Sequence, residues 1–533
     1  MPAFTPGRRG LIGGIGAAAL LPPLATTFAR AQAARVLNMA VSAPPASIDP
    51  HYYTLTPSIM LSAHMFEPLT IRDENARVKP GLAESWRLVD DTTWEFSIRR
   101  GVRFHDGSEL VAADVAYSIA RVPTVQSPSS FAVYTRAITG TEVVNTHTIR
   151  FKTANPYPLL PTDLASIFIV PRGIGDNVPS SDFNNGRAAI GTGPFKFISY
   201  SPNDRVEMER FEDYWGTKPE WQRLNYRVIT NTGSRVAALL SGDVELIDNV
   251  PTGDIARLRR DNRLTLVEGT SLRLIFLGLD VERDKPLPDV TGPNGEELDR
   301  NPFKDLRVRR ALSEAISRDA IVSRIMEGAA VPAGQFMPAG TYGHAPGIKV
   351  PPFDAAGAKK LLAEAGYPDG FSVVLRGPND RYINDAQVLQ AVAQMWTRIG
   401  VRTQVDAQPL STLIGRLNRF EASCYLLGWS NSTGEPSTSL RAVLGSRGKG
   451  GGLGLSNYGR YSNDRMDAAT ADALSTLDDA ERERKLQAAM KLAMDDVAVI
   501  PLHTQKSVWG MRQGYRYVAR VDENTLATSM ARA

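Results

Sequence analysis

The sequence of 533 residues contains a single cysteine, Cys424. One thiol has no partner within the chain, which excludes a fold held by internal disulfide bonds. Cys424 lies in the apolar run Glu421-Ala-Ser-Cys-Tyr-Leu-Leu-Gly-Trp429. Its apolar neighbours predict a buried thiol that packs as a small hydrophobic side chain.

Histidine is also scarce, with six residues in the whole chain. None belongs to an H-E-x-x-H motif, and none is spaced with a second histidine or a cysteine as zinc ligands are. The histidines are His51, His64, His105, His147, His344 and His503. We therefore predict no metal site and no cofactor.

The motifs of nucleophilic catalysis are incomplete. Gly428-Trp-Ser-Asn-Ser432 lacks the final glycine of the G-x-S-x-G nucleophile turn. Ser446-Arg-Gly-Lys449 matches S-x-x-K, but it lies in a glycine-rich loop and lacks the companion S-D-N and K-T-G motifs. The sequence therefore predicts a protein that is not an enzyme.

Charge of one sign is not in large excess, because 61 Lys and Arg stand against 57 Asp and Glu, a net charge of +4. Three positive charges, Arg8, Arg9 and Arg30, lie in the first 31 residues, which hold no acid. The rest of the chain has no basic block, which argues against nucleic-acid binding. Beyond residue 31 no run reaches 18 apolar residues, so we predict no membrane span.

Residues 1–31 have the features of an export signal. A positive start is followed by an apolar stretch, Leu11–Ala25, and by Ala29-Arg-Ala31, which predicts a signal peptide cleaved after Ala31. Arg8-Arg9 resembles a twin-arginine signal, and the alternative is an ordinary Sec signal that begins with two arginines. No cysteine lies near residue 31, so we expect a periplasmic protein that is not a lipoprotein.

The hydrophobic patterns of the remaining chain predict a mixture of helices and strands. Alternating and apolar runs predict strands over residues 92–99, 371–375, 401–405 and 498–502. Helical periodicity predicts helices over residues 112–122, 306–328, 355–366, 385–400 and 478–496. The strand–helix–strand order of residues 371–405 predicts a parallel sheet in the C-terminal half.

Several motifs, in the same order along the chain, resemble the family 5 extracellular solute-binding proteins, which are oligopeptide, dipeptide and nickel receptors of ABC importers. The most specific stretch runs from Lys79-Pro-Gly-Leu-Ala-Glu-Ser-Trp86 through Trp94 to Gly107. Further matches are Ser47-Ile-Asp-Pro50, His64-Met-Phe-Glu-Pro-Leu69, Gly191-Thr-Gly-Pro-Phe195, Leu240-Ser-Gly-Asp-Val244, Val308-Arg-Arg-Ala-Leu312, Ala363-Glu-Ala-Gly-Tyr367 and Ile500-Pro-Leu502. The resemblance covers essentially the whole chain after residue 35.

These motifs also have a structural interpretation that does not depend on the resemblance to a family. Trp86, Trp94, Phe96 and Phe104 have the spacing of core aromatic residues. Gly191-Thr-Gly-Pro194 predicts a place where two backbone segments cross so closely that side chains would clash. The motifs therefore describe a scaffold, and the ligand site needs separate evidence.

The resemblance implies an α/β fold of the two-lobed periplasmic binding protein type II (cluster C), with an extra subdomain inserted in the first lobe. On this basis we expect a hinge lobe formed by residues 35–71, 187–277 and 497–533. The inserted subdomain would be residues 72–186, and the second lobe residues 278–496.

The function that the resemblance implies is solute capture. The protein would bind a peptide or peptide-sized solute in a cleft between the lobes and deliver it to an ABC permease and ATPase complex in the inner membrane. We expect a monomer. Two alternatives stay open: a secreted hydrolase on the same scaffold, and a sensory or chaperone protein that uses the same cleft.

Candidate ligand contacts follow from the family's binding mode. Peptide receptors of the family hold the ligand near a tryptophan that ends a strand, which here is Trp429, followed by the polar residues Ser430, Asn431, Ser432 and Thr433. The family's ammonium-binding aspartate falls at Ser432, and the nearest acid is Glu435. Tyr52 and Tyr53 in an early loop, Tyr342, and Arg376 complete the predicted contacts, with Arg441 as another possible carboxylate ligand.

For three of these residues packing is the competing interpretation. Trp429 belongs either to the core or to the cleft wall, and Tyr52 and Tyr53 either contact a ligand or pack between the lobes.

Overall fold

The computed structural model describes residues 35–533, apart from residues 286 and 451. The predicted signal peptide at residues 1–31 and its cleavage site lie outside the described residues. Residues 35–533 form one compact unit. Within that unit, most of the strands belong to a single mixed sheet.

The large sheet has the strand order β13-β15-β17-β12-β18-β11-β1-β10-β9-β8, with β14 paired to β18 and β16 paired to β15. Its strands are β1 (Val36–Val41), β8 (Phe195–Ser201), β9 (Arg205–Arg210), β10 (Arg223–Val228), β11 (Leu246–Ile247), β12 (Leu264–Leu279), β13 (Val290–Thr291), β14 (Ala330–Pro332), β15 (Phe371–Pro378), β16 (Val401–Gln408), β17 (Cys424–Ser430) and β18 (Ile500–Arg512). β1 and β10 pair in parallel, as do β15 and β16, and most other neighbours are antiparallel.

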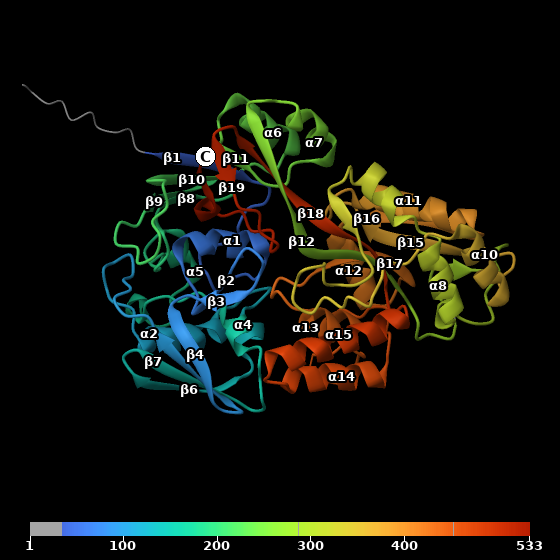
Figure 1. The fold of residues 1–533 in the computed structure, drawn as a ribbon, viewed down its shortest axis with the longest axis horizontal. Coiled ribbons are helices and arrows are strands. Elements are labelled where there is room, and N and C mark those ends of the chain that lie inside the picture. The colour runs from blue at the N-terminus through green and yellow to red at the C-terminus, as the bar shows by residue number, and fades with distance from the viewer. Residues whose placement is uncertain (1–34, 286, 451) are drawn as a thin grey trace, which may run out of the picture. The chain divides into compact units, whose positions relative to one another are not determined.

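Two long strands connect the two halves of this sheet. β12 and β18 pair antiparallel along most of their length, and their register shifts between Thr270 and Leu274 and again between Ile275 and Phe276. On one side of this irregular stretch β18 pairs with β11, and on the other β12 pairs with β17. Figure 1 shows both strands crossing from one group of elements to the other. This is the geometry that hinge strands require, while the predicted lobe boundaries remain predictions.

The half of the sheet that contains β1 packs against helices from several parts of the chain. Its core includes Trp221 and Tyr226, both with no more than 1% of their surface exposed. The helices of this half are α1 (Thr56–Met65), α5 (Ser180–Asn184), α6 (Thr232–Ser241) and α7 (Thr252–Arg259). The crossing predicted at Gly191 is confirmed: a Cβ placed there would lie 2.0 Å from the carbonyl oxygen of Met65.

A separate four-stranded antiparallel sheet, β4-β5-β7-β6, occupies part of the predicted inserted subdomain. Phe96, in one of its strands, and Phe104 are fully buried, and Trp86 stacks on Phe96, which confirms the predicted aromatic core. Its strands are β4 (Ala83–Asp90), β5 (Thr93–Ile98), β6 (Ile138–Asn145) and β7 (Thr148–Thr153), near the small pair β2 (Thr70–Arg72) and β3 (Val78–Pro80). Its helices are α2 (Ala112–Arg121), α3 (Ala132–Thr135) and α4 (Leu160–Leu164).

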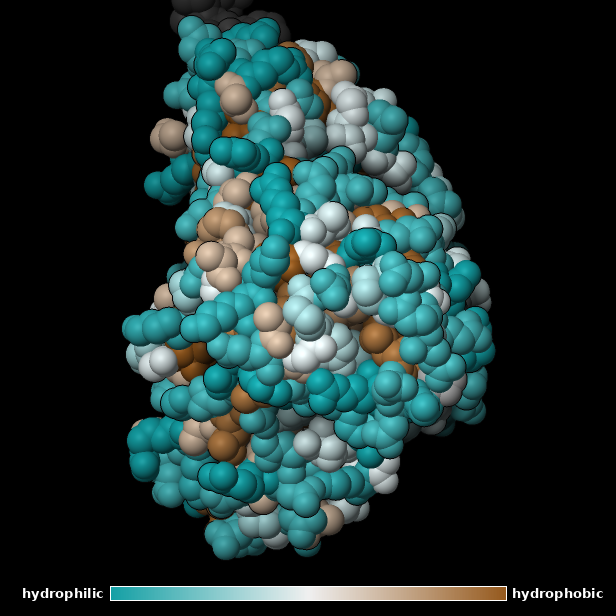
Figure 2. Space-filling view, turned by 90° about the vertical axis from the view of Figure 1, so that its right-hand side faces the viewer, coloured by the Kyte–Doolittle hydropathy of each residue, from teal (hydrophilic) through white to brown (hydrophobic). Residues whose placement is uncertain are grey.

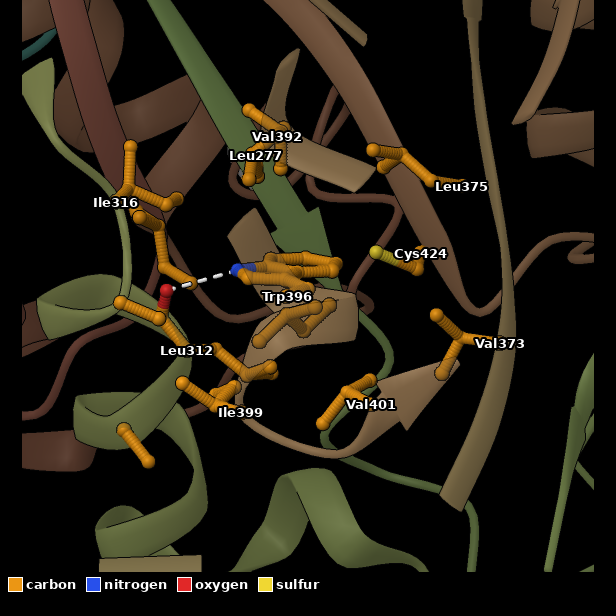
Figure 3. Packing of buried hydrophobic residues seen from close by; sticks show 14 of the residues in the cluster. Leu277, Leu312, Ile316, Val373, Leu375, Val392, Trp396, Ile399, Val401 and Cys424 are labelled. Carbon is orange, nitrogen blue, oxygen red and sulfur yellow. Dashed lines mark hydrogen bonds between the residues drawn. The ribbon is translucent and has the colours of Figure 1, made fainter. Parts of the chain in front are cut away.

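The other half of the large sheet has its own core. Trp396 is fully buried there and donates a hydrogen bond from Nε1 to the carbonyl oxygen of Leu312, 2.9 Å away (Figure 3). Cys424 is 1% exposed in the same cluster, so the predicted buried thiol is confirmed. The helices are α8 (Leu306–Glu314), α9 (Arg318–Ala320), α10 (Ala355–Glu364), α11 (Asp385–Arg398), α12 (Leu410–Asn418), α13 (Ser437–Ser439), α14 (Asp464–Ser475) and α15 (Asp479–Asp495).

Two sequence-based expectations need correction. The helix predicted over residues 306–328 is broken, because α8 ends at Glu314 and Ser317 caps α9 by accepting a hydrogen bond from the amide of Ala320. The buried guanidinium of Arg318 stabilises the chain at this break, because it donates hydrogen bonds to the carbonyl oxygens of Ser313 and Pro501. The sheet of the C-terminal half is also mixed, since β12 pairs antiparallel with both β17 and β18.

The face of the molecule drawn in Figure 2 is largely hydrophilic, and its hydrophobic residues gather only in small groups. Scattered exposure of this kind is ordinary for a protein surface. Among the described residues, no helix is both long enough and apolar enough to cross a membrane.

The short strands β19 (Tyr515–Tyr517) and β20 (Met530–Arg532) pair with each other near the end of the chain.

Candidate ligand-binding site

A cavity of about 320 Å³ lies between the segment 133–163 and the segment 429–456. The first segment belongs to the predicted inserted subdomain and the second to the predicted second lobe. The lining residues are Val133, Tyr134, Arg136, Tyr157, Leu159, Thr162, Asp163, Trp429, Thr433, Glu435, Ser437, Thr438, Arg441, Ala442, Gly452, Leu455 and Ser456. Apolar and aromatic walls with a few polar groups are typical of a small-molecule site.

The segment that follows β17 supplies one wall. β17 ends at Ser430, so that Trp429 lies at the end of the strand and the polar residues from Asn431 onward leave the sheet at the cavity. Trp429 is half-buried, and its indole Nε1 lies 3.4 Å from the hydroxyl of Thr438, to which it donates a hydrogen bond. Thr433 is buried, and its hydroxyl has no hydrogen-bond partner among the described residues. A buried unsatisfied hydroxyl at a cavity wall is a group that a ligand can satisfy.

Two carboxyl groups face the cavity from opposite walls. Glu435 is 4% exposed, and one oxygen, Oε2, forms an ion pair with Arg482 while Oε1 has no hydrogen-bond partner among the described residues. Asp163 accepts a hydrogen bond of 2.6 Å from the hydroxyl of Tyr157. Burial raises the pKa of Asp163 to about 7, and the nearby charge of Glu435 contributes, against the opposing effects of the Tyr157 hydrogen bond and the charge of Arg72.

Two arginines also line the cavity, and they come from opposite walls. Arg136 follows α3 and is exposed, whereas Arg441 lies in the helical turn Leu440–Leu444 after α13. Burial lowers the pKa of Arg441, and the like charge of Arg136 lowers it further. A Cβ placed on Gly452 would lie 3.4 Å from Nη1 of Arg136 and 3.5 Å from Nη2 of Arg441. Both guanidinium groups therefore reach the same point in the cavity.

Of the predicted polar residues around Trp429, only Thr433 lines the cavity beside it. Asn431 is fully buried and accepts a hydrogen bond of 3.0 Å from the hydroxyl of Thr438. Ser430 pairs with Arg273 at the end of β17, and Ser432 is exposed. These three residues are close in sequence to the lining residues Trp429 and Thr433 but do not line the cavity themselves. Their role in ligand binding stays a prediction.

Tyr52 and Tyr53 lie in a loop that contacts the predicted inserted subdomain. Tyr53 bridges to Ser129, and the hydroxyl of Ser127 donates a hydrogen bond to the carbonyl oxygen of Tyr52. Both tyrosines are half-buried and neither lines the cavity. These contacts suit the packing interpretation of the two tyrosines, whose contact with a ligand stays a prediction.

Tyr342 and Arg376 are not among the residues that line the cavity. The hydroxyl of Tyr342 donates a hydrogen bond of 2.8 Å to the carbonyl oxygen of Asp479, and its ring is 5.0 Å from the guanidinium carbon of Arg482. Arg376 forms two hydrogen bonds of 2.8 and 2.9 Å with Asp289 and pairs also with Asp406. A ligand at Arg376 would have to compete with two carboxylates, and this residue too stays a prediction.

A second depression, of about 480 Å³, follows the edge strands β13, β15 and β16. Its lining includes Asp289, Arg402 and Gln404 but no aromatic residue, and it is more open to solvent than the first cavity. Its walls come mainly from neighbouring strands of one sheet, with Thr397 of α11 beside them. This depression is therefore a groove at a sheet edge and does not enclose a ligand between separate parts of the chain.

The sequence did not point to the wall formed by the inserted segment, with Tyr134, Arg136, Tyr157 and Asp163. One usable signal was present: Asp163 is the only charged residue in the apolar stretch 157–171. An acid in such a stretch becomes buried with the surrounding residues unless the helix turns it to water. The described residues also contain no group of three His, Cys, Asp or Glu side chains that could hold a metal ion.

A cavity between two separate segments of one chain, with charged groups on both walls and a strand pair that crosses between the halves, is the arrangement expected of a protein that binds a solute. Residues 77–451 match the family described as "Bacterial extracellular solute-binding proteins, family 5 Middle". The chain belongs to this family, which confirms the resemblance stated from the motifs.

Relatives of known function are similar over most of their length. The glutathione-binding protein GsiB of Salmonella typhimurium (strain LT2) is 28% identical, with 90% of each chain covered. The dipeptide-binding protein of Escherichia coli (strain K12) is 28% identical, with 79% of each chain covered. Heme-binding protein A of Haemophilus influenzae is 27% identical over 80% of this chain and 78% of its own.

Solved structures confirm the fold. HbpA2 from Haemophilus parasuis superposes with a TM-score of 0.79 at 22% identity and covers 93% of this chain and 100% of its own. The periplasmic binding protein DppA from Helicobacter pylori, in complex with peptide STSA, gives a TM-score of 0.74 at 22% identity over 93% and 98% of the two chains. The predicted α/β fold of a periplasmic binding protein is therefore correct.

Proposed function

We propose that this protein is the periplasmic substrate-binding component of an ABC importer and that it captures a peptide-sized solute in the cavity beside Trp429. Family membership supports the receptor role, and the names of two of the relatives, the glutathione-binding and the dipeptide-binding protein, support small peptides as the solute class. The observation that carries the placement of the solute is the pair of buried, unsatisfied acceptors on the cavity wall, Oε1 of Glu435 and the hydroxyl of Thr433.

Within this cavity Glu435 takes the place of the family's ammonium-binding aspartate. Its Oε2 is held by Arg482, which fixes the carboxylate, while Oε1 is left for a donor from the ligand. A buried ion pair needs its remaining lone pairs satisfied, and a ligand ammonium would do this. Trp429 provides an apolar and aromatic surface for the solute next to this group.

The substitution Glu435→Gln tests this placement. Glutamine can still accept the hydrogen bond from Arg482 but offers no charge to an ammonium group. We expect trialanine to bind the variant at least about tenfold more weakly than the parent, measured by titration calorimetry. Glu421→Gln, a change at an exposed glutamate outside the cavity, is the matched control and should bind as the parent does. Equal binding by the parent and Glu435→Gln would contradict the assignment.

A receptor and a hydrolase differ in what they release. No histidine is among the described residues that line the cavity, which leaves its serines, Ser437 and Ser456, without a neighbouring imidazole base. We expect the solute that co-purifies with the protein from the periplasm to be released unaltered, as judged by mass spectrometry. Recovery of a cleaved solute would favour the hydrolase.

The partner of the loaded protein would be a membrane permease with its ATPase, and export would use the predicted signal at residues 1–31, of the twin-arginine type. We propose a monomer, because the cavity is built from one chain. Loss of solute uptake on deletion of the gene separates an importer from a sensory or chaperone protein.

A further inference from the structure

The turn of the β2–β3 hairpin carries a buried alanine among exposed residues. Glu74, Asn75 and Arg77 are exposed, whereas Ala76 is only 3% exposed. A two-stranded hairpin has no core of its own that could bury a residue at its tip, so other parts of the chain cover Ala76. The buried hydrophobic residues that pack with it are Leu272 of β12, Met337 and Val521. One small cluster therefore joins the predicted inserted subdomain to the predicted hinge lobe and the predicted second lobe.

The carboxylate of Asp73 fixes the shape of this hairpin tip, residues 73–77. Its Oδ1 accepts hydrogen bonds of 3.0 and 2.8 Å from the amides of Asn75 and Arg77. The amide of Ala76 donates a hydrogen bond of 3.0 Å to the carbonyl oxygen of Asp73. Ala76 has a φ of +59°, which is uncommon for a residue other than glycine and is held here by these hydrogen bonds. The tip is therefore a rigid turn with a fixed outer surface.

This tip contacts the backbone of the cavity wall at Gly434. A Cβ placed on Gly434 would lie 2.3 Å from the carbonyl oxygen of Ala76 and 3.1 Å from its Cβ, so only glycine leaves room for the tip. In the sequence Gly434 stands between Thr433 and Glu435, the two residues that present unsatisfied polar atoms at the cavity. The tip therefore packs against the wall segment that carries the proposed ligand contacts.

Arg77 makes a second contact with the predicted second lobe. Its guanidinium carbon lies 5.5 Å from the ring centre of Tyr342, and that of Arg482 lies 5.0 Å from the same ring centre. Arg482 also forms the ion pair with Glu435. Because a guanidinium group is attracted to an aromatic ring, Arg77 and the arginine that holds Glu435 both bind to Tyr342.

Backbone hydrogen bonds connect the same tip to the hinge strand and to the cavity wall. The amide of Val521 donates to the carbonyl oxygen of Glu74 at 2.9 Å, and the amide of Leu272 donates to that of Val521 at 3.0 Å. The amide of Asn431 then donates to the carbonyl oxygen of Leu272 at 3.1 Å. Leu272 lies in the irregular stretch of β12, where the register with β18 shifts. The tip is thus joined to the place where the two halves of the sheet can bend.

We propose that the hairpin tip, residues 73–77, is a latch that docks on the second lobe when the walls of the cavity come together and that holds them closed around the solute. A contact made only in the closed arrangement shifts the equilibrium toward that arrangement. Because the turn is already rigid, docking costs it little conformational entropy. This inference rests on the proposed capture of a solute and adds the element that maintains the enclosure.

Alkylation of an introduced thiol tests whether the tip docks. The only cysteine of the chain, Cys424, is 1% exposed, so a thiol placed at the tip can be alkylated selectively. Ala76→Cys puts the thiol at the buried position, and Asn75→Cys, at the exposed neighbour in the same turn, is the matched control. With trialanine bound, we expect iodoacetamide to react with Ala76→Cys at least about tenfold more slowly than with Asn75→Cys. Equal rates would overturn the latch.

Addition of Arg77→Gln to both cysteine variants separates docking on the second lobe from burial within the hairpin's own surroundings. Loss of the contact with Tyr342 should raise the rate at residue 76, relative to that at residue 75, about threefold. The reference at residue 75 corrects for the loss of a positive charge near the thiol. Arg100→Gln, at an exposed arginine of the same predicted subdomain, should leave the relative rate unchanged. An unchanged relative rate in Arg77→Gln would show that the latch is wrong, while the capture of trialanine stands.

Calorimetry shows first whether trialanine binds the parent protein at all. If it does not, the proposed solute class fails, and the two rates are measured on the protein without added solute. A rate at residue 76 below that at residue 75, raised about threefold by Arg77→Gln, would then support the latch by itself. Equal rates at the two positions, or no effect of Arg77→Gln, would overturn it.

Discussion

Arg121 and Asp49 form a two-point ion pair whose side chains are almost completely buried. Nη1 and Nη2 of Arg121 lie 2.9 and 2.7 Å from the two carboxylate oxygens of Asp49, and the side chains are 5% and 0% exposed. Ser180 donates a further hydrogen bond of 2.7 Å to Asp49. Burial alone would raise the pKa of Asp49, but the hydrogen bonds and charge of Arg121 outweigh it and hold that pKa below its usual value. The pair fastens the loop that carries Tyr52 to α2.

Removal of one member of this pair leaves a buried charge without compensation. We expect Arg121→Met to lower the free energy of unfolding by about 3–5 kcal/mol, as is typical when a buried ion pair loses one partner. Urea unfolding measures this change. Arg87→Met breaks an ion pair with Glu95 whose arginine is 68% exposed, and should cost less than about 1 kcal/mol. Losses of similar size in the two variants would contradict the prediction.

The raised pKa of Glu67 predicts that the stability of the protein depends on pH. Its carboxylate accepts hydrogen bonds from Thr192, Tyr214 and Trp215, yet burial dominates and raises its pKa to about 7 from a reference value of 4.5. Folded Glu67 therefore holds its proton to a higher pH than unfolded Glu67. Its stabilising contribution is full below about pH 4.5 and is lost as the pH rises to about 7, a change of about 3 kcal/mol.

The nearly isosteric variant Glu67→Gln cannot lose a proton and should lack this change. Other buried groups also titrate in this range, since burial lowers the pKa of His51 and of His64 to about 4, which acts in the opposite direction. The difference between parent and variant isolates Glu67. We expect the free energy of unfolding of the parent, minus that of the variant, to fall by about 3 kcal/mol between about pH 4 and about pH 8. A difference that stays constant with pH would rule out this role of Glu67.

A substitution of Trp429 tests whether this residue belongs to the cavity wall or to the core. It is half-buried and lines the cavity, although part of its ring packs against the neighbouring hydrophobic cluster. We expect Trp429→Ala to weaken trialanine binding at least about tenfold while lowering the stability of the empty protein by less than about 2 kcal/mol. Trp396→Ala, at a fully buried tryptophan, should cost about 3–5 kcal/mol. Equal stability losses in thermal unfolding would assign Trp429 to the core.

The sequence predicted local structure better than the assembly of the site. The strand at β5, the helices α2, α10, α11 and α15, and the parallel pair β15–β16 follow from hydrophobic periods that span only a few residues. The break after α8 was missed because Arg318 is held by partners that include Pro501, which lies far along the chain. Hydrophobic periodicity carries no information on contacts between residues that are so far apart in the sequence.

The candidate site shows the same division. Trp429 and Thr433 were accessible to sequence reasoning because Trp429 lies at the end of one buried strand and Thr433 follows that strand closely. Their counterpart Asp163 belongs to a segment more than 250 residues earlier, and only the packed structure brings it to the same cavity. Arg376 was predicted from its place at a strand, but the carboxylates of Asp289 and Asp406 that surround it come from other elements.

We expect Asp163 to make ligand binding depend on pH. Burial raises its pKa to about 7, and Tyr157, Arg72, Glu435 and Arg136 are the groups that act on it. Across the range from about pH 5 to about pH 7, the terminal amine of trialanine stays protonated and its carboxylate stays ionised. Ionisation of Asp163 is then the change that favours a ligand ammonium, so affinity for trialanine should rise about tenfold over this range. Asp163→Asn should abolish the rise, and Asp91→Asn, at an exposed acid outside the cavity, should retain it. Calorimetry at the two pH values measures both, and a rise that persists in Asp163→Asn would place the titrating group elsewhere.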